Sequence, residues 1–246
     1  MVTHPPRQSL DPTTLDPATL ALLCGLGPIF TVHACYALSA SAGFVPACVP
    51  YLDGCTSISA AGRHGWGYFL FKAGMLPSAA LIIIYWRLCR AWLLAAGDVE
   101  GPGLRSLVWL GMAGALFMML YSVFLGHAGE PYNLLRRFGV SLNLGFTYLA
   151  QLLLVWRLGR IQLETRLVLC PPAILRAKTW LVAGLLVLGL GSIPVSNFIV
   201  DKDPAENAIE WVFCLLLSSF YLLTAVAWRM TGFRLAVTNQ RAAPRG

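Results

Sequence analysis

Six long apolar runs constrain this chain more than any other feature of its sequence. A helix needs about 20 apolar residues to cross the hydrocarbon core of a bilayer. The runs do not alternate apolar with polar residues, as the strands of a membrane barrel would. They cover residues 20–40, 66–86, 107–125, 140–156, 180–199 and 209–230. The sequence therefore predicts an all-α, polytopic membrane protein, a bundle of six transmembrane helices.

Composition agrees with this fold class and divides the chain. Hydrophobic residues make up 57% of the chain and charged residues 12%, and the mean hydropathy is +0.68, outside the range of a soluble domain. The net charge of +7 comes from residues scattered between apolar runs, which argues against nucleic-acid binding. We expect an exposed tail at 1–17, the membrane domain at 18–231 and a basic tail at 232–246.

A cleaved secretory signal is the alternative interpretation of the first run. Residues 39–42 are small, as at a cleavage site, and they follow an apolar stretch. Against this interpretation, the run at 20–40 is longer than a usual signal core, and the tail before it has no basic cluster. We therefore keep the first run as a transmembrane helix.

The distribution of Lys and Arg predicts the orientation of the bundle. Cytoplasmic segments of membrane proteins carry an excess of these residues. Of the 18 Lys and Arg residues, 13 fall on the side of the two termini, four fall on the opposite side, and Lys72 lies inside a span. We therefore expect both termini in the cytoplasm and three outward loops, at residues 41–65, 126–139 and 200–208.

Tryptophans and glycines in the spans carry further expectations. Tryptophan near the end of a span favours the membrane interface because its ring is amphipathic, and glycine permits close approach of neighbouring helices. The tryptophans concerned are Trp66, Trp86, Trp156, Trp180 and Trp228, and the glycines are Gly111, Gly114, Gly184, Gly189 and Gly191.

Costly polar residues concentrate on the predicted outer side. An ionisable residue in a span is expensive unless it pairs or faces a wet cavity. The largest group lies in residues 50–77, a polar loop that continues directly into an apolar helix. The candidates are Asp53, Ser57, Ser59, Arg63, His64 and Lys72 from this stretch, and His33, His127, Glu130, Asn143, Asn197 and Glu210 from other segments. We predict that they form an outward-opening polar pocket.

Each candidate also has a purely structural interpretation. Glu210 would favour the positive N-terminal end of its own helix, and Lys72 would extend its amine to the outer interface. His33 would be an interior, hydrogen-bonded histidine. Ser57 and Ser59 would belong to a hydroxyl-rich turn before the second helix, and the two asparagines would bridge helices.

Cysteine spacing and motif searches leave the chemistry open. Cys48 and Cys55 share the first outer loop, where an oxidising exterior would join them, although spacing alone does not fix their geometry. The chain has no G-x-S-x-G, P-loop, G-x-G-x-x-G or H-E-x-x-H motif, and we expect no cofactor and no metal. Neither a histidine and aspartate metal site nor a serine and histidine pair is supported by spacing.

Three short features resemble a known family. Residues 57–62, SISAAG, stand in an outer loop after the first span, His127 follows the third span, and Glu210 and Trp211 open the sixth. Together they are similar to the Frag/DRAM/Sfk six-transmembrane family, and most closely to its members that remodel GPI-anchor lipids in the Golgi. The resemblance implies a membrane protein that acts on lipids or organises them. An alanine-, leucine- and arginine-rich composition suggests a bacterial source, where GPI anchors are absent, and there we expect the plasma (inner) membrane.

The leading hypothesis is therefore binding and remodelling of a phospholipid or glycolipid at the outer pocket. Catalytic candidates are His127, Glu210, Ser57, Ser59 and His64, and substrate-binding candidates are Asp53, Arg63, Lys72, His33, Glu130 and Asn197. The expected partner is membrane lipid, with a protein partner in the membrane as a further option. The alternatives are a non-catalytic organiser or accessory subunit and, with less support, a small transporter, because the inner half lacks matching ionisable groups.

Overall fold

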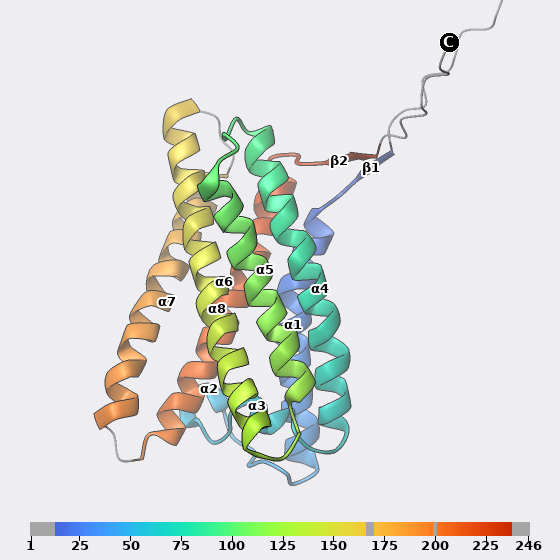
Figure 1. Ribbon diagram of the computed structural model, residues 1–246, viewed down its shortest axis with the longest axis vertical. Coiled ribbons are helices and arrows are strands. Elements are labelled where there is room, and N and C mark those ends of the chain that lie inside the picture. The colour runs from blue at the N-terminus through green and yellow to red at the C-terminus, as the bar shows by residue number, and fades with distance from the viewer. Residues whose placement is uncertain (1–12, 166–169, 199–200, 238–246) are drawn as a thin grey trace, which may run out of the picture.

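The computed structural model describes residues 13–165, 170–198 and 201–237 and confirms the helical fold (Figure 1). Six helices among these residues are long and apolar enough to cross a membrane, so the chain is an integral multi-pass membrane protein. They are α1 (Ala18–Ser41), α4 (Gly65–Ala95), α5 (Pro102–Phe124), α6 (Glu130–Thr165), α7 (Pro172–Phe198) and α8 (Asp203–Met230). The short elements are β1 (Thr13–Leu15), α2 (Pro50–Asp53), α3 (Ile58–Ala61) and β2 (Leu235–Val237).

The six long helices form a ring in which each packs against the next. The order around the ring is α1, α4, α5, α6, α7, α8 and back to α1. Of the neighbouring pairs in the ring, α6 and α7 pack together least, and α7 leans away from α6 in its lower half (Figure 1), so the ring is least tightly closed on this side. Glu130 of α6 and Glu210 of α8, two of the functional candidates, line a cavity here.

The two ends of the bundle differ in what they contain. We call the end at which β1 and β2 lie the terminal end, and it also holds the link from α4 to α5 and the last turn of α6 (Figure 1). The strands pair antiparallel, with Thr14 opposite Ala236. The opposite end, which we call the loop end, holds α2, α3 and the link from α5 to α6. Both described ends of the chain lie at the same end of the bundle, as an even number of membrane crossings requires (Figure 1). That this end faces the cytoplasm stays a prediction. Residues 1–12 and 238–246 of the expected tails lie outside the described residues.

Helices extend well beyond the apolar runs that predicted them. The fourth run, at 140–156, lies inside the 36-residue helix α6, and the sixth, at 209–230, lies in a helix that begins at Asp203. Apolar runs report only the part of a helix that lies in lipid, whereas polar turns continue it into water. Side-chain pairs such as Arg160 with Glu164, four residues apart, support such turns.

Aromatic side chains fill the interior toward the terminal end. Trp86 and Trp228 are fully buried, with the ring of Tyr85 5.0 Å from Trp86 and 5.6 Å from Trp228. The prediction of an interfacial position was therefore wrong for these two tryptophans, because they face neighbouring helices. By contrast, Trp66 and Trp180 are 79% and 76% exposed and face the surroundings of the bundle, where a membrane protein contacts lipid.

Close helix approach at glycine is confirmed in one helix and absent in another. A Cβ at Gly111 of α5 would collide with the ring of Trp86, and one at Gly114 would collide with Thr147 of α6. At Gly184 and Gly191 of α7, no atom lies within 4 Å of an added Cβ. The prediction therefore holds for α5, which packs on both sides, and fails for α7.

Candidate functional site

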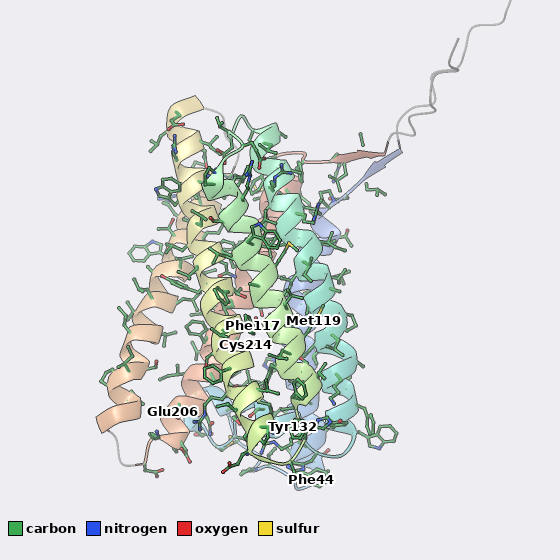
Figure 2. All side chains as sticks on the ribbon, in the orientation of Figure 1. Phe44, Phe117, Met119, Tyr132, Glu206 and Cys214 are labelled. Atoms are coloured by element: carbon green, nitrogen blue, oxygen red, sulfur yellow. A yellow bond between two sulfur atoms is a disulfide. The ribbon has the colours of Figure 1, made fainter. Side chains whose placement is uncertain are left out.

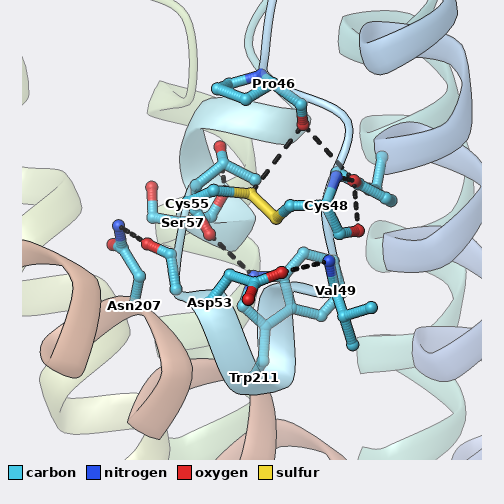
Figure 3. The surroundings of a disulfide bond; sticks show 11 residues. Pro46, Cys48, Val49, Asp53, Cys55, Ser57, Asn207 and Trp211 are labelled. Atoms are coloured by element: carbon cyan, nitrogen blue, oxygen red, sulfur yellow. Dashed lines mark hydrogen bonds between the residues drawn. A yellow bond between two sulfur atoms is a disulfide. The ribbon is translucent and has the colours of Figure 1, made fainter.

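A disulfide bond shapes the loop that covers the loop end. Cys48 and Cys55 are joined, with their Cα atoms 6.5 Å apart, and α2 lies between them (Figure 3). Asp53, at the end of α2, accepts a 2.8 Å hydrogen bond from the backbone N–H of Val49. The predicted substrate-binding residue Asp53 therefore closes its own turn. We call residues 42–64 the lid loop.

Hydrogen bonds fix the lid loop to two helices. The amide of Asn207 and the indole N–H of Trp211, both on α8, donate 2.9 Å bonds to the carbonyl groups of Gly54 and Thr56 (Figure 3). On α1, the hydroxyl of Ser39 donates a 2.6 Å bond to the carbonyl of Ala61. Gly54 also has a φ of +57°, and a Cβ there would collide with the Pro204 backbone. The lid loop is thus a rigid wall between α1 and α8.

A cavity of about 1240 Å³ opens at the loop end beneath this wall. Its lining comes from the lid loop and from α5, α6 and α8: Ser59, Arg63, Tyr121, Glu130, Pro131, Asn133, Leu134, Arg136, Arg137, Val140, Leu144, Glu206 and Glu210. Between Glu130 and Leu144 it follows α6 for about 20 Å at 1.5 Å per residue. Figure 2 labels Glu206 at this end of α8. This cavity contains four of the predicted residues, Ser59, Arg63, Glu130 and Glu210, and its outward orientation stays a prediction.

The position of Glu210 excludes its simplest structural explanation. Because α8 begins at Asp203, Glu210 lies two turns into the helix, whereas Asp203 and Glu206 occupy the first turn. The favourable effect of a helix dipole on a carboxylate is confined to the first turn. Glu210 instead lines the cavity and interacts with the backbone amide of Ile58 in the lid loop.

The charged groups of the cavity are brought together without neutralising one another. Three arginines and three glutamates line it, and among the described residues no salt bridge joins one set to the other; Glu206 pairs with Lys202 at 3.6 Å. Arg63 and Arg136 are close enough for their like charges to interact. Arg136 is held by the carbonyl of His127 and by Asn133, at 3.1 and 2.6 Å.

Two polar atoms of the cavity residues have no partner. The hydroxyl of Tyr121 and the Nε of Arg63 are buried, and neither has a hydrogen-bond partner. Tyr121 is 4% exposed and interacts electrostatically with Glu210 and with both Arg63 and Arg136. Buried polar groups normally find partners, and exceptions call for an explanation such as a ligand.

His33 is an interior histidine. Its Nδ1 lies 2.7 Å from the carbonyl oxygen of Ile29 and its Nε2 2.9 Å from the hydroxyl of Tyr51. Since a carbonyl oxygen only accepts, Nδ1 donates, and Nε2 of the neutral ring accepts from Tyr51. The ring also packs on the edge of Trp211. Nδ1 is therefore bonded within α1 and Nε2 joins α1 to α2, while the ring contacts α8 through Trp211.

Three other basic candidates lie outside the cavity lining. Lys72 donates a 2.5 Å bond to the hydroxyl of Tyr68, one turn away on α4, and lies over its ring; no salt bridge to Glu210 is present among the described residues. His64 stacks on Phe44. His127 packs against the rings of Phe124 and Tyr132. The structure therefore does not bring these three residues to Glu210.

The remaining candidates have local roles or undescribed side chains. Ser57 caps α3 by accepting a 3.1 Å bond from the Ala60 N–H, and its hydroxyl lies 3.1 Å from that of Ser59. Asn143 accepts a 3.4 Å bond from Thr147 of its own helix. The side chain of Asn197 lies outside the described residues. The hydroxyl-rich turn is thus confirmed, with Ser59 also reaching the cavity.

Sequence reasoning missed both the partners in the cavity and a buried lysine elsewhere. Arg136 and Arg137 were counted only as loop charges, and Tyr121 gave no signal because it lies inside an apolar run. At the terminal end, Lys178 is fully buried and donates to Thr224 at 2.6 Å and to the carbonyl of Phe220 at 3.3 Å. Its place next to a predicted span was the available signal.

Neither a metal-binding cluster nor a similar known protein assigns a function to the cavity. Among the described residues, no group of three or more His, Cys, Asp and Glu side chains is placed to hold a metal ion. Comparison of the chain with protein-family models, with curated proteins and with solved structures finds no match.

Proposed function

We propose that this membrane protein binds the headgroup of a phospholipid or glycolipid in the loop-end cavity, and so organises or remodels the lipids of its membrane. The observation that carries the proposal is the position of the cavity across the predicted membrane boundary. Its charged lining, such as Arg136, precedes the apolar run of α6, while Val140 and Leu144 lie within that run. A cavity with charged residues outside the predicted membrane span and apolar residues within it suits a molecule that has both a charged and an apolar part.

The least closed part of the ring supports access from the membrane. The cavity lies between α6 and α8, whose direct contacts are few. A lipid that entered from the bilayer would need no passage through water for its acyl chains, which is favourable by about 0.8 kcal/mol for each CH₂ kept out of water. Lateral entry is therefore the path that we expect.

A non-catalytic organiser is the second candidate, and the arrangement of serine and histidine favours it. Nucleophilic catalysis needs a base within about 3 Å of the nucleophile. Among the described residues, no hydrogen bond joins Ser57 or Ser59 to a histidine, and His64 and His127 are outside the cavity lining. Binding without bond cleavage therefore requires less rearrangement than hydrolysis or acyl transfer.

Comparative lipid mass spectrometry tests both candidates. Membranes would be compared from cells that lack the protein, express it, or express Glu210→Gln, with Glu164→Gln at the terminal end as the matched control. Altered acyl composition would support remodelling, and an altered leaflet distribution alone would support the organiser. If the deletion changes the lipids but Glu210→Gln restores them fully, the cavity is not the site.

A further inference from the structure

The loop-end cavity has positive and negative groups on different elements. Arg63 comes from the lid loop and Arg136 from α6, whereas Glu206 and Glu210 come from α8; a third glutamate, Glu130, begins α6. The two glutamates of α8 are four residues apart, so they share one face of their helix. Among the described residues, no salt bridge joins these arginines to these glutamates, although Glu206 pairs with Lys202 at 3.6 Å. A ligand group of opposite charge would therefore displace no salt bridge at the arginines and only the Lys202 pair at the glutamates.

The positive side has the chemistry of a phosphate site. Arginine binds phosphate with its planar fork of N–H donors, and two guanidinium groups with interacting like charges are stabilised by an anion. Arg63 Nε and the Tyr121 hydroxyl add two donors that have no partner in the protein. These donors need an acceptor, and phosphate oxygens supply several.

The negative side selects among phosphate-bearing molecules. Carboxylates at Glu206 and Glu210 repel a second anionic group and attract an ammonium group. A quaternary ammonium is usually held by an aromatic cage, but Tyr121 is the one aromatic residue among those that line the cavity. A primary ammonium, by contrast, donates hydrogen bonds directly to carboxylates.

From this charge separation, and resting on the proposed lipid-binding function, we propose that the cavity recognises a phosphodiester that carries a primary ammonium, as in a phosphoethanolamine headgroup. Phosphate binds the side of Arg63, Arg136 and Tyr121, and the ammonium binds the side of Glu206 and Glu210. A phosphate and a primary ammonium also occur together in free phosphoethanolamine, which is a phosphate monoester and not a diester. The apolar wall at Val140 and Leu144 gives only the lipid an additional contact.

Ligand-induced stabilisation of the purified full-length protein in detergent tests the proposal. The probes are short-chain phosphatidylethanolamine, phosphatidylcholine and phosphatidylglycerol, together with free phosphoethanolamine and inorganic phosphate. We expect phosphatidylethanolamine to bind about tenfold more tightly than phosphatidylglycerol, since a charge-assisted hydrogen bond contributes enough for such a difference. Equal affinity for the two lipids would overturn the proposal.

Variants separate the two sides of the site. In Glu206→Gln/Glu210→Gln, the preference for the amine is expected to disappear while binding of phosphatidylglycerol persists. In Arg63→Gln and in Arg136→Gln, binding of every phosphate probe is expected to weaken about tenfold. Arg160→Gln, in an exposed pair at the terminal end, is the matched control. A variant that does not fold is replaced by Arg137→Gln or by a single glutamate change, with folding checked by circular dichroism.

The other possible results distinguish a failure of the headgroup inference from a failure of the proposed lipid-binding function. If all lipids bind without headgroup preference, and the glutamate variants change nothing, the headgroup inference fails while lipid binding stands. If free phosphoethanolamine binds as tightly as the lipid, the membrane lipid is not the ligand. If no lipid stabilises the folded protein at all, the proposed function fails as well.

Discussion

Charged residues are buried and paired or hydrogen-bonded at the terminal end of this bundle, whereas at the loop end they are half-buried or exposed and line a cavity. At the terminal end, Arg157 of α6 pairs with Asp98 in the link after α4, with the side chains 10% and 14% exposed, and Lys178 reaches Thr224. The cavity beside Arg157 measures only about 100 Å³. At the loop end, charges of both signs surround a cavity of about 1240 Å³ and do not pair with one another.

This difference distinguishes residues that stabilise the fold from residues free to bind a ligand. A buried charge costs free energy unless it is paired or hydrogen-bonded. At the terminal end, Arg157 and Lys178 have partners within the protein, so changes to those pairs should act on stability, although Arg157 Nε has no partner among the described residues. At the loop end, the cavity charges of opposite sign do not pair with one another, so changes there should act on binding.

Asp98→Ala should have the largest effect on stability. It leaves Arg157 without its partner in a largely buried position, and we expect a loss of about 3 kcal/mol in the free energy of unfolding. Denaturant unfolding in detergent micelles would measure it. Glu164→Ala breaks a pair whose side chains are both 57% exposed and should cost less than about 0.5 kcal/mol. Similar losses in both variants would contradict the contrast between buried and exposed pairs.

Opening the disulfide of the lid loop should come next. Cys48→Ser/Cys55→Ser removes a short covalent ring, and from loop-closure entropy we expect a loss of about 2.5 kcal/mol in the free energy of unfolding.

The native disulfide also tests the orientation of the bundle in the membrane. Four of the five free cysteines are buried, so the protein is unfolded before alkylation; without reduction, the reagent should then modify these five and leave two protected. Modification of all seven cysteines in protein from oxidising preparations of whole cells would argue against an outward-facing loop end.

Thr224→Val probes the buried lysine. The hydroxyl of Thr224 accepts from Lys178 and lies 2.8 Å from that of Tyr85, so its loss should cost about 2 kcal/mol. In a Lys178→Met background, the same change should cost about half as much, because one partner has already gone. Thr179→Val, at an exposed site on α7, is the control. Equal costs in both backgrounds would show that Lys178 and Thr224 are not coupled.

Arg63→Gln should leave stability nearly unchanged in lipid-free detergent. It removes a guanidinium that has a like charge nearby and no carboxylate partner, so we expect a change within about 0.5 kcal/mol, toward higher stability. Thermal unfolding would measure it beside Asp98→Ala. A loss as large as that of Asp98→Ala would remove the contrast between the two ends.

The free energy of unfolding should depend slightly on pH through Asp16, which lies between β1 and α1. The backbone N–H of Ala18 and, further, the guanidinium of Arg234 lower the pKa of Asp16 from its ordinary value of 3.8, while desolvation opposes them. Because the folded-state pKa is depressed, the contribution to stability is present above the unfolded pKa and is lost as pH falls through the folded value. Unfolding measured from pH 6 to pH 3 should show less acid sensitivity in Asp16→Asn, and an identical pH profile would contradict this role.

The sequence alone was sufficient for the fold class and for four of the residues that line the cavity. Six apolar runs are local properties of the chain, and each is long enough to specify a helix in lipid. Ser59, Arg63, Glu130 and Glu210 were identified because polar side chains at similar depth are unusual in such a chain. The structural interpretation of His33 was also available from the sequence, since an imidazole in an apolar span needs partners.

Which polar residues lie next to one another depends on the tertiary structure. Contact between helices depends on their order around the ring, their rotation about their axes and their full length, none of which an apolar run records. The early start of α8 moves Glu210 beyond the reach of its own helix dipole, and the packing of α5 against α6 brings Tyr121 near Arg136. Lys72, at similar depth, turns to Tyr68 instead. The sequence sets where along its helix a polar residue lies, whereas helix packing sets the direction in which its side chain points.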